Sequence, residues 1–399
     1  MKSALAIVAA AVLVSLGSAP RLLGGSLPGV MATDVSTARY DSQTLVSPVL
    51  YRGGDGIGLL ALIKQAKTSR WWRNDPSKRG WPLYGPWVAF PYNPATGTFG
   101  QGKQVLNDLA ASLFGHGSLR DPKYHLAAGG SKNLLFLVSE VPIDGPPSDI
   151  ALAKLEVATA ADSLTLKGWR SFRHNELRGG REEPYLSFFL DSPDLLVLPP
   201  SGRLLLAGNS GEASLWLTLS EDGGSTWHDL QLLGPRYDSG IAPLLLRTAE
   251  GLVLLYIDQT RPLSLSELES KALHKKFFRG THKMPGPIAV MRSPDAASWA
   301  TTMEGVAGAR DVDSFAACVG PSGRLFVVYS RRDQRAGHLY LATSADSGTN
   351  WSVPVQLTDG AFVDVYPSVI ASDGKLIVAF TRFHLDGTQL LCYTTVPIQ

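Results

Sequence analysis

The sequence has little that would tie it to a metal, a redox centre, a nucleic acid or a bilayer. Only two cysteines occur, and the eight histidines show no ligand spacing, so no metal site is expected. Lys and Arg number 37 against 35 Asp and Glu, and no basic run stands out, which argues against nucleic-acid binding. We expect no cofactor, no metal, no nucleic-acid partner and no membrane span in the mature chain.

The two cysteines, Cys318 and Cys392, each fall inside a stretch that reads as a β-strand. The two strands belong to different copies of a repeat described below. A buried cysteine behaves as a small apolar residue. We therefore expect two buried free thiols rather than a disulfide.

The first 32 residues read as an export signal. Lys2 supplies a positive charge, and residues 4–16 form an apolar run of signal-peptide length that is short for a membrane span. Small residues at Val30 and Ala32 place the mature start near Thr33. We expect a secreted or periplasmic protein; an uncleaved anchor is the alternative.

The remaining chain has the composition of a folded all-β protein. Hydrophobic residues make up 44% of the sequence, with 9 Trp, 12 Tyr and 14 Phe, so a sizeable core can form. The 40 Gly and 26 Pro together make about a sixth of the chain, which favours many turns between short strands.

An 18-residue unit recurs six times: an apolar run, a turn with Gly and often Lys or Arg, and a second apolar run. The copies are residues 47–64, 123–140, 193–210, 241–258, 314–331 and 366–383. Runs of this length between turn residues predict strands, and their nearly continuous apolarity predicts burial on both faces. Each unit is therefore expected to be a β-hairpin inside the molecule.

A second motif lies in the more polar stretch after some hairpins. Ser220, Asp222, Gly224 and Trp227 form S-x-D-x-G-x-x-W, and residues 344–351 repeat it at the same spacing. A copy one residue shorter begins at Ser293, with Ala297 where Gly is expected. Asp and Ser side chains can bond the turn backbone, Gly permits positive φ, and Trp can fill the space between sheets.

This motif resembles the Asp-box of the sialidase superfamily. The resemblance implies a six-bladed β-propeller, with residues 33–399 as a single domain, in which the Asp-box aspartates are structural. The blades are expected near 47–106, 119–170, 190–233, 237–305, 310–358 and 363–399. Because the sixth repeat ends early, an N-terminal strand within 37–46 is expected to complete the last blade and close the ring, which leaves no free sheet edge there.

Long insertions at 65–86, 141–147, 171–190 and 259–286 are expected on one face of this scaffold, where binding usually resides. The first contains Trp71, Trp72, Asp75 and Trp81. Exposed rings stack on sugars, so these tryptophans are candidate ligand contacts; packing of the loop onto the propeller rim is an equal alternative.

Strand ends predict a polar mouth around the axis, with calcium as an open possibility. Its members are Lys64, Asp121, Glu140, Asp191, Asp238, Asp258, Asp311, Asp313, Arg331, Arg332, Asp364, Tyr366 and Arg382. Such a mouth suits either a polar ligand or water.

The resemblance also implies roles for some of these residues. Family sialidases use a tyrosine nucleophile, a glutamate that activates it, an acid and three arginines that hold the substrate carboxylate. Tyr366 is placed as the nucleophile and Asp75 as the acid. Arg331, Arg332, Arg382 and Asp313 are candidate substrate contacts.

The sequence departs from the family pattern at three places. Val46-Ser47-Pro48 stands where the first arginine is expected, Tyr237-Asp238-Ser239 where the glutamate is expected, and Tyr256-Ile257-Asp258 where the second arginine is expected.

Two functions stay open, both with a glycan as partner and a monomer as the expected state. One is an exo-acting glycoside hydrolase of the sialidase kind that cleaves terminal sugars. The other is a non-catalytic propeller that binds a glycan or a protein through the long-loop face. A polysaccharide lyase is a third reading, with Tyr124-His125 as its candidate pair.

Overall fold

The computed structural model describes most of the predicted strands. The described residues are 36–39, 44–53, 56–65, 83–105, 125–128, 134–141, 149–157, 164–172, 191–209, 215–228, 230–233, 241–258, 285–301, 305–333 and 336–398. All secondary-structure elements within the described residues are β-strands. No helix in this part of the chain is long and apolar enough to cross a membrane. The predicted signal segment and most of each long insertion lie outside it.

The strands form five sheets, of which four are antiparallel and the fifth contains one parallel bridge. The first sheet contains β2 (Thr44–Gly53), β3 (Gly56–Gln65), β4 (Leu83–Asn93), β5 (Thr98–Phe99) and β6 (Lys103–Val105). The second contains β7 (His125–Ala128), β8 (Leu134–Val141), β9 (Asp149–Val157) and β10 (Leu164–Phe172). The third contains β11 (Asp191–Leu198), β12 (Arg203–Asn209), β13 (Leu215–Ser220) and β14 (Gln231–Leu233). The fourth contains β15 (Ile241–Thr248), β16 (Gly251–Ile257), β17 (Ile288–Ser293) and β18 (Ala300–Thr301).

The last eight strands form one sheet. They are β19 (Val312–Val319), β20 (Leu325–Asp333), β21 (Ala336–Ser344), β22 (Val355–Gln356), β23 (Val363–Ser372), β24 (Lys375–Phe383), β25 (Gln389–Pro397) and β1 (Ser36–Ala38). A single parallel pairing of Gly337 with Val363 joins the β19–β22 group to the β23–β25 group. The N-terminal β1 pairs antiparallel with β25, whereas Thr44–Val46 already belong to β2.

All six repeats predicted from the sequence are antiparallel hairpins. The paired strands are β2 with β3, β7 with β8, β11 with β12, β15 with β16, β19 with β20, and β23 with β24. Among the second strands with described side chains, β12 and β16 are buried on both faces along almost their whole length. Continuous apolarity predicted this burial because neither face of such a strand meets water.

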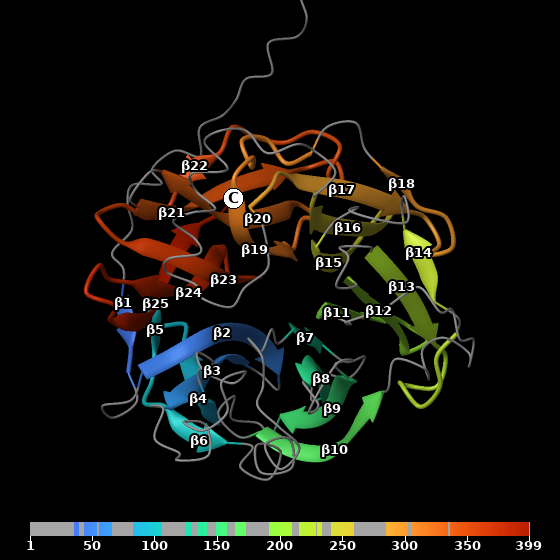
Figure 1. Ribbon diagram of the computed structural model, residues 1–399, viewed down its shortest axis with the longest axis horizontal. Helices are drawn as coiled ribbons and strands as arrows, with labels where there is room; N and C mark the ends of the chain where they lie inside the picture. Colours follow the sequence, from blue (N-terminus) through green and yellow to red (C-terminus); the bar gives the residue numbers. More distant parts are fainter. Residues whose placement is uncertain are drawn as a thin grey trace, which may run out of the picture.

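The first strands of the six hairpins surround a common centre. They contact one another in the cyclic order β2, β7, β11, β15, β19, β23 and again β2. Figure 1 shows the strand groups following one another around this centre in the order of the chain.

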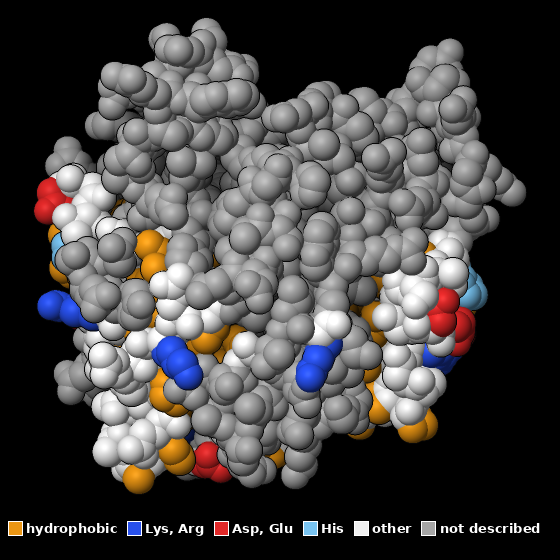
Figure 2. Space-filling model, turned by 90° about the horizontal axis from the view of Figure 1, so that it is seen from below, with side chains coloured by type: hydrophobic (Ala, Val, Ile, Leu, Met, Phe, Trp, Pro, Cys, Tyr) orange, Lys and Arg blue, Asp and Glu red, His pale blue; other side chains and the backbone are white. Residues whose placement is uncertain are grey.

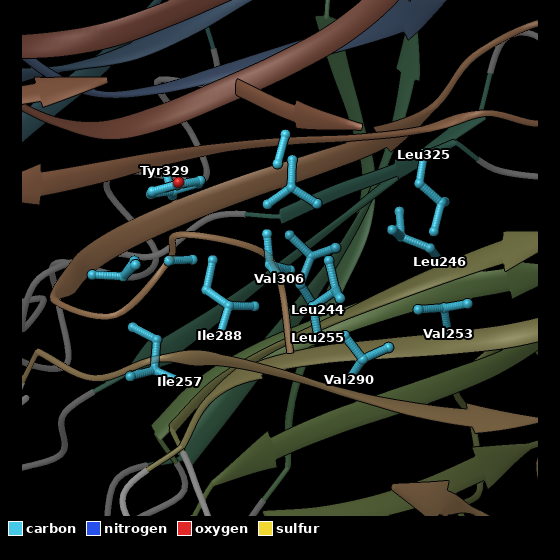
Figure 3. Packing of buried hydrophobic residues seen from close by; sticks show 14 of the residues in the cluster. Leu244, Leu246, Val253, Leu255, Ile257, Ile288, Val290, Val306, Leu325 and Tyr329 are labelled. Atoms are coloured by element: carbon cyan, nitrogen blue, oxygen red, sulfur yellow. The ribbon is translucent and has the colours of Figure 1, made fainter. Parts of the chain in front are cut away.

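Apolar side chains fill the layers between neighbouring groups. One cluster joins the β15–β17 group to β20 and β21 and includes Leu255, Val290, Leu325 and Tyr329 (Figure 3). Equivalent clusters lie between β12–β13 and β16–β17, between β20–β21 and β23–β25, and between β2–β4 and β24–β25. Burial of these side chains is the main source of stability of the fold.

Side chains also bond the first strands of neighbouring groups. Asp194 of β11 accepts the Leu245 N–H of β15. At the meeting of the last and first groups, the Leu50 N–H donates to Ser368 Oγ (2.8 Å), and Arg52 Nη2 donates to the Ala371 carbonyl (2.9 Å). These bonds satisfy backbone groups that no ladder reaches.

Four of the first strands carry a bulge where the sequence has X-Pro. The register shifts at Ser47-Pro48, Ser192-Pro193, Ala242-Pro243 and Tyr366-Pro367. Proline lacks the N–H that a regular ladder needs, so a bulge accommodates it.

The two S-x-D-x-G turns share one hydrogen-bond pattern. Ser220 Oγ donates to Asp222 Oδ1 (2.9 Å) and accepts the Gly224 N–H (2.8 Å). In the second turn Ser344 does the same with Asp346 (2.8 Å) and Gly348 (2.9 Å). Hydrogen bonds from Thr226 lower the pKa of Asp222 to about 2. These aspartates are therefore engaged in the turns, as the sequence predicts.

The shortened third turn places its strained residue differently from the sequence prediction. Ala296, not Ala297, has positive φ (70°), and its N–H donates to Ser293 Oγ (2.8 Å), as the glycine does in the other turns. The third residue after the serine is left-handed in all three turns, as Gly223 and Ser347 show. The shortened turn lacks the second left-handed residue that Gly224 and Gly348 supply. An alanine at the third position is strained because its Cβ crowds the backbone.

Ala296→Gly is expected to raise the free energy of unfolding by up to about 1 kcal/mol, because glycine adopts positive φ without strain. Ala297→Gly is the matched control, since Ala297 is not among the described residues with positive φ. It should lower stability by a few tenths of a kcal/mol through backbone entropy. Urea denaturation of both variants measures the difference, and an equal effect of the two would contradict the assignment.

Both cysteines are free thiols, as predicted. Burial raises the pKa of Cys318 to about 12 and that of Cys392 to about 11. Neither is therefore a reactive thiolate at neutral pH.

Candidate functional site

Four of the nine candidate site residues have described side chains. Asp75, Trp71, Trp72 and Trp81 lie outside the described residues. Arg332 is placed in its backbone, opposite Gly337 in the ladder of β20 with β21. The four described side chains lie on four different strands: Asp313 on β19, Arg331 on β20, Tyr366 on β23 and Arg382 on β24.

Tyr366 lies in the bulge near the start of β23, in a left-handed conformation (φ 54°). Its side chain packs against the small cluster of Val363 and Val365, as that of Phe383 also does. Its N–H donates to Ser314 Oγ of β19 at 2.8 Å. A bulky residue at positive φ is rare, and such outliers cluster at functional sites.

Arg382 is bound to a buried aspartate. Its Nε and Nη2 donate to the two carboxylate oxygens of Asp364 at 2.7 and 2.8 Å. Asp364 is fully buried, and the Arg382 side chain is 12% exposed. The guanidinium also stacks on Phe362, 4.5 Å from the ring centroid. Two of the three guanidinium nitrogens are thus already used within the protein.

Arg331 rests on an aromatic pair. Its guanidinium lies 4.3 Å from the Tyr340 ring centroid, and its Nη2 donates to Tyr340 Oη at 3.2 Å. Tyr340 in turn stacks on Tyr329. Within the described residues, no carboxylate pairs with Arg331, so this cation remains able to receive an anion.

Asp313 occupies the register shift at the start of β19, between Val312 and Ser314. Its side chain is half-buried. Ser314, the next residue, contacts Tyr366. Asp313 is therefore the sequence neighbour of the residue that binds the Tyr366 backbone.

The sheets distribute these side chains over different layers. Arg331 lies on the face of β20 that packs against the β15–β17 group, together with Tyr329. Arg382 lies on the opposite layer, between β20–β21 and β24, beside Phe380. Phe383 packs against the same Val363 and Val365 cluster as Tyr366 and shares the other face of β24, where Ala379 packs against β2–β4. The sequence predicted these strand ends but not the division between layers.

Sequence reasoning missed Ser314 and Ser330. They are cross-strand partners in the ladder of β19 with β20. Ser330 Oγ donates to the Asp364 carbonyl at 2.7 Å, while Ser314 accepts from Tyr366. The available signal was a hydroxyl residue at each end of one hairpin copy, but nothing in the sequence indicates which backbone groups they reach.

Figure 2 shows the described Lys and Arg side chains of one face at separate positions. Among the described residues no group of three or more metal-ligating side chains is gathered.

No protein-family model matches the sequence, and no curated protein matches it. Solved structures do. A Dyadobacter fermentans protein of unknown function has a TM-score of 0.61 at 14% identity, covering 94% of this chain and 100% of that one. A Trypanosoma rangeli sialidase bound to the inhibitor DANA has a TM-score of 0.53 at 12% identity, covering 88% of this chain and 55% of that one. A Hadza microbial sialidase has a TM-score of 0.54 at 13% identity, with 89% and 66% covered.

These identities establish the fold alone. The chain spans 55% of the length of the trypanosomal sialidase. It has a sialidase-like all-β fold, and its activity is a separate question.

Proposed function

We propose that the chain is an exported, monomeric, six-bladed β-propeller whose ring is closed by β1 in the last blade. Three observations support closure: the cyclic contacts of the first strands, the pairing of β1 with β25, and the bond from Leu50 to Ser368. The parallel bridge of Gly337 with Val363 then joins two neighbouring blades rather than merging them.

We infer that this propeller is a glycoside hydrolase of the sialidase kind, acting on terminal sugars of glycans. The observation that carries the proposal is Tyr366, a bulky residue held at φ 54° at the inner end of a hairpin. Strain of this kind costs about 1–3 kcal/mol and persists where the surrounding structure imposes it. The sialidase-like fold supports the same reading.

The chemistry assigns a role to each candidate. Tyr366 Oη would bond to the anomeric carbon while the glycosidic C–O bond breaks, and Asp75 would protonate the leaving oxygen. A neutral phenol suits an anionic sugar because the carboxylate of the sugar does not repel it. A tyrosine nucleophile is a known exception to the usual mechanism of glycoside hydrolases, which uses two catalytic carboxylates. Arg331 would hold that carboxylate, and Asp313 would receive the phenol proton. Trp71, Trp72 and Trp81 would stack on sugar rings, and Arg332 would add a cation.

Tyr366→Phe is expected to reduce hydrolysis of a fluorogenic sialoside to the background rate, because the variant lacks the attacking oxygen. The release of the fluorophore by wild type and variant measures this. Circular dichroism and the thermal unfolding midpoint serve as the fold control. Equal rates for the two proteins would eliminate Tyr366 as nucleophile.

A non-catalytic glycan-binding propeller is the second candidate. The pairing of Arg382 with Asp364 favours it, since an arginine with two nitrogens engaged is poorly placed to hold a substrate carboxylate. This reading predicts no hydrolysis by the wild type, together with glycan binding that Tyr366→Phe leaves unchanged. Calorimetric titration with sialylated and neutral oligosaccharides distinguishes the two candidates.

A further inference from the structure

The segment from Asp364 to Tyr366 departs from a regular strand. Two residues, Tyr366 and Pro367, are skipped in the register of β23 with β24. Tyr366 has positive φ, although the residue before a proline is ordinarily extended. Neither feature is favourable by itself, so the neighbouring structure must hold the segment in place.

Two serines of the adjacent hairpin contact both ends of this segment. Ser330 Oγ donates to the Asp364 carbonyl at 2.7 Å, and Ser314 Oγ accepts the Tyr366 N–H at 2.8 Å. The serines lie opposite each other in their own ladder, and Ser330 is fully buried. Together they take the place of the ladder bonds that the bulge interrupts.

The bulge decides on which face the tyrosine ring lies. In a regular strand Tyr366 would share a face with Asp364, two residues earlier. The observed side chain instead packs against the Val363 and Val365 cluster, and these two residues alternate with Asp364 along the strand, on the face opposite the Asp364–Arg382 pair. Losing the bulge would turn the phenol toward the wrong layer.

We propose that Ser314 and Ser330 are positioning residues for Tyr366, holding its backbone so that the phenol keeps the observed face. Their effect on catalysis rests on the proposed function of Tyr366 as nucleophile. Their effect on the orientation of the ring does not depend on that function, so the positioning role and the proposed function can be refuted separately.

The molecule contains a matched control. Ala242 also has positive φ (52°), precedes a proline and lies in the bulge of β15. Its N–H donates to Asn209 Oδ1 of the preceding hairpin at 3.2 Å. Asn209 therefore holds the same backbone arrangement around a residue without a reactive side chain.

The first experiment needs no activity. We place 3-fluorotyrosine at position 366 and record its fluorine NMR signal in the full-length protein. Ser314→Ala and Ser330→Ala are expected to shift or split the signal, Ser314→Thr to restore it, and Asn209→Ala to leave it unchanged. An unshifted signal in both alanine variants would overturn the proposal. Should one alanine variant fail to fold, the other decides by the same criterion.

The second experiment measures sialoside hydrolysis. Ser314→Ala is expected to lower kcat at least about tenfold, because small misplacements of a reacting group are costly. KM should change little, since the serine does not contact substrate. Ser314→Thr should recover the rate, and Asn209→Ala should keep it despite lower stability. A fall in kcat that is equal in Ser314→Ala and Asn209→Ala would show a merely structural role. An inactive wild type would refute the proposed hydrolase and leave the fluorine result to decide the positioning.

Discussion

Arg382→Ala is expected to lower the free energy of unfolding by about 3–5 kcal/mol, because it leaves the Asp364 carboxylate buried without its partner. Asp364 is fully buried, and both of its oxygens accept from Arg382. The guanidinium also covers Phe362 and Phe380, so some packing is lost as well. Urea denaturation at neutral pH gives the value.

The double variant Asp364→Leu with Arg382→Met is the control. It removes both charges and keeps apolar volume, and replacement of a buried ion pair in this way is often neutral. We expect it to be clearly more stable than Arg382→Ala. Equal losses in the two proteins would mean that packing, not the unpaired charge, dominates. A sialoside assay on the folded double variant would also show whether Arg382 is needed for substrate.

Stability is expected to fall as the pH rises from about 4 to about 7, through Asp194. Burial raises the pKa of this carboxyl from 3.8 to about 7, outweighing its bonds from the Leu245 and Leu195 backbone. The folded state therefore holds a proton that the unfolded state has released above pH 4. The stabilisation is complete below pH 4 and is lost as the pH approaches 7. Its size is on the order of 4 kcal/mol, since one pKa unit corresponds to about 1.4 kcal/mol.

Asp194→Asn tests the assignment. An asparagine cannot ionise and still offers an oxygen to the Leu245 N–H. In urea denaturation, the free energy of unfolding of the variant should fall much less between pH 4 and pH 7 than that of the wild type. The aspartates of the S-x-D turns titrate below this window, because their pKa values are lowered. An unchanged slope in the variant would contradict the role of Asp194.

The repeated hairpins could be predicted because each is encoded locally. Continuous apolar runs separated by turn residues, such as 314–331 and 366–383, predict paired strands. The predicted burial on both faces is wrong for the first strand β19, most of whose residues are half-buried. The S-x-D turns could be predicted equally well, since Ser220 and Asp222 form hydrogen bonds with groups no more than four residues away. The shortened turn was predicted less well, because the left-handed residue that takes the place of the second glycine is Ala296 rather than Ala297.

The candidate site was less predictable because its bonds join distant segments. The strand-end pattern identified Tyr366, Arg331 and Arg382 as polar ends. It could not show that Arg382 is paired with Asp364 or that Arg331 rests on Tyr340. These partners follow from cross-strand register, which one shifted residue reverses. The loop residues Asp75, Trp71, Trp72 and Trp81 lie outside the described residues and stay predictions.

The sequence by itself determined the strands, their hairpins and the S-x-D turns, since short-range periodicity and turn chemistry specify them. The tertiary structure alone decided which face each polar side chain occupies and which backbone groups the two serines hold. The physical reason is that a bulge changes strand parity at a single residue, and the two serines that bond the Tyr366 segment come from another hairpin.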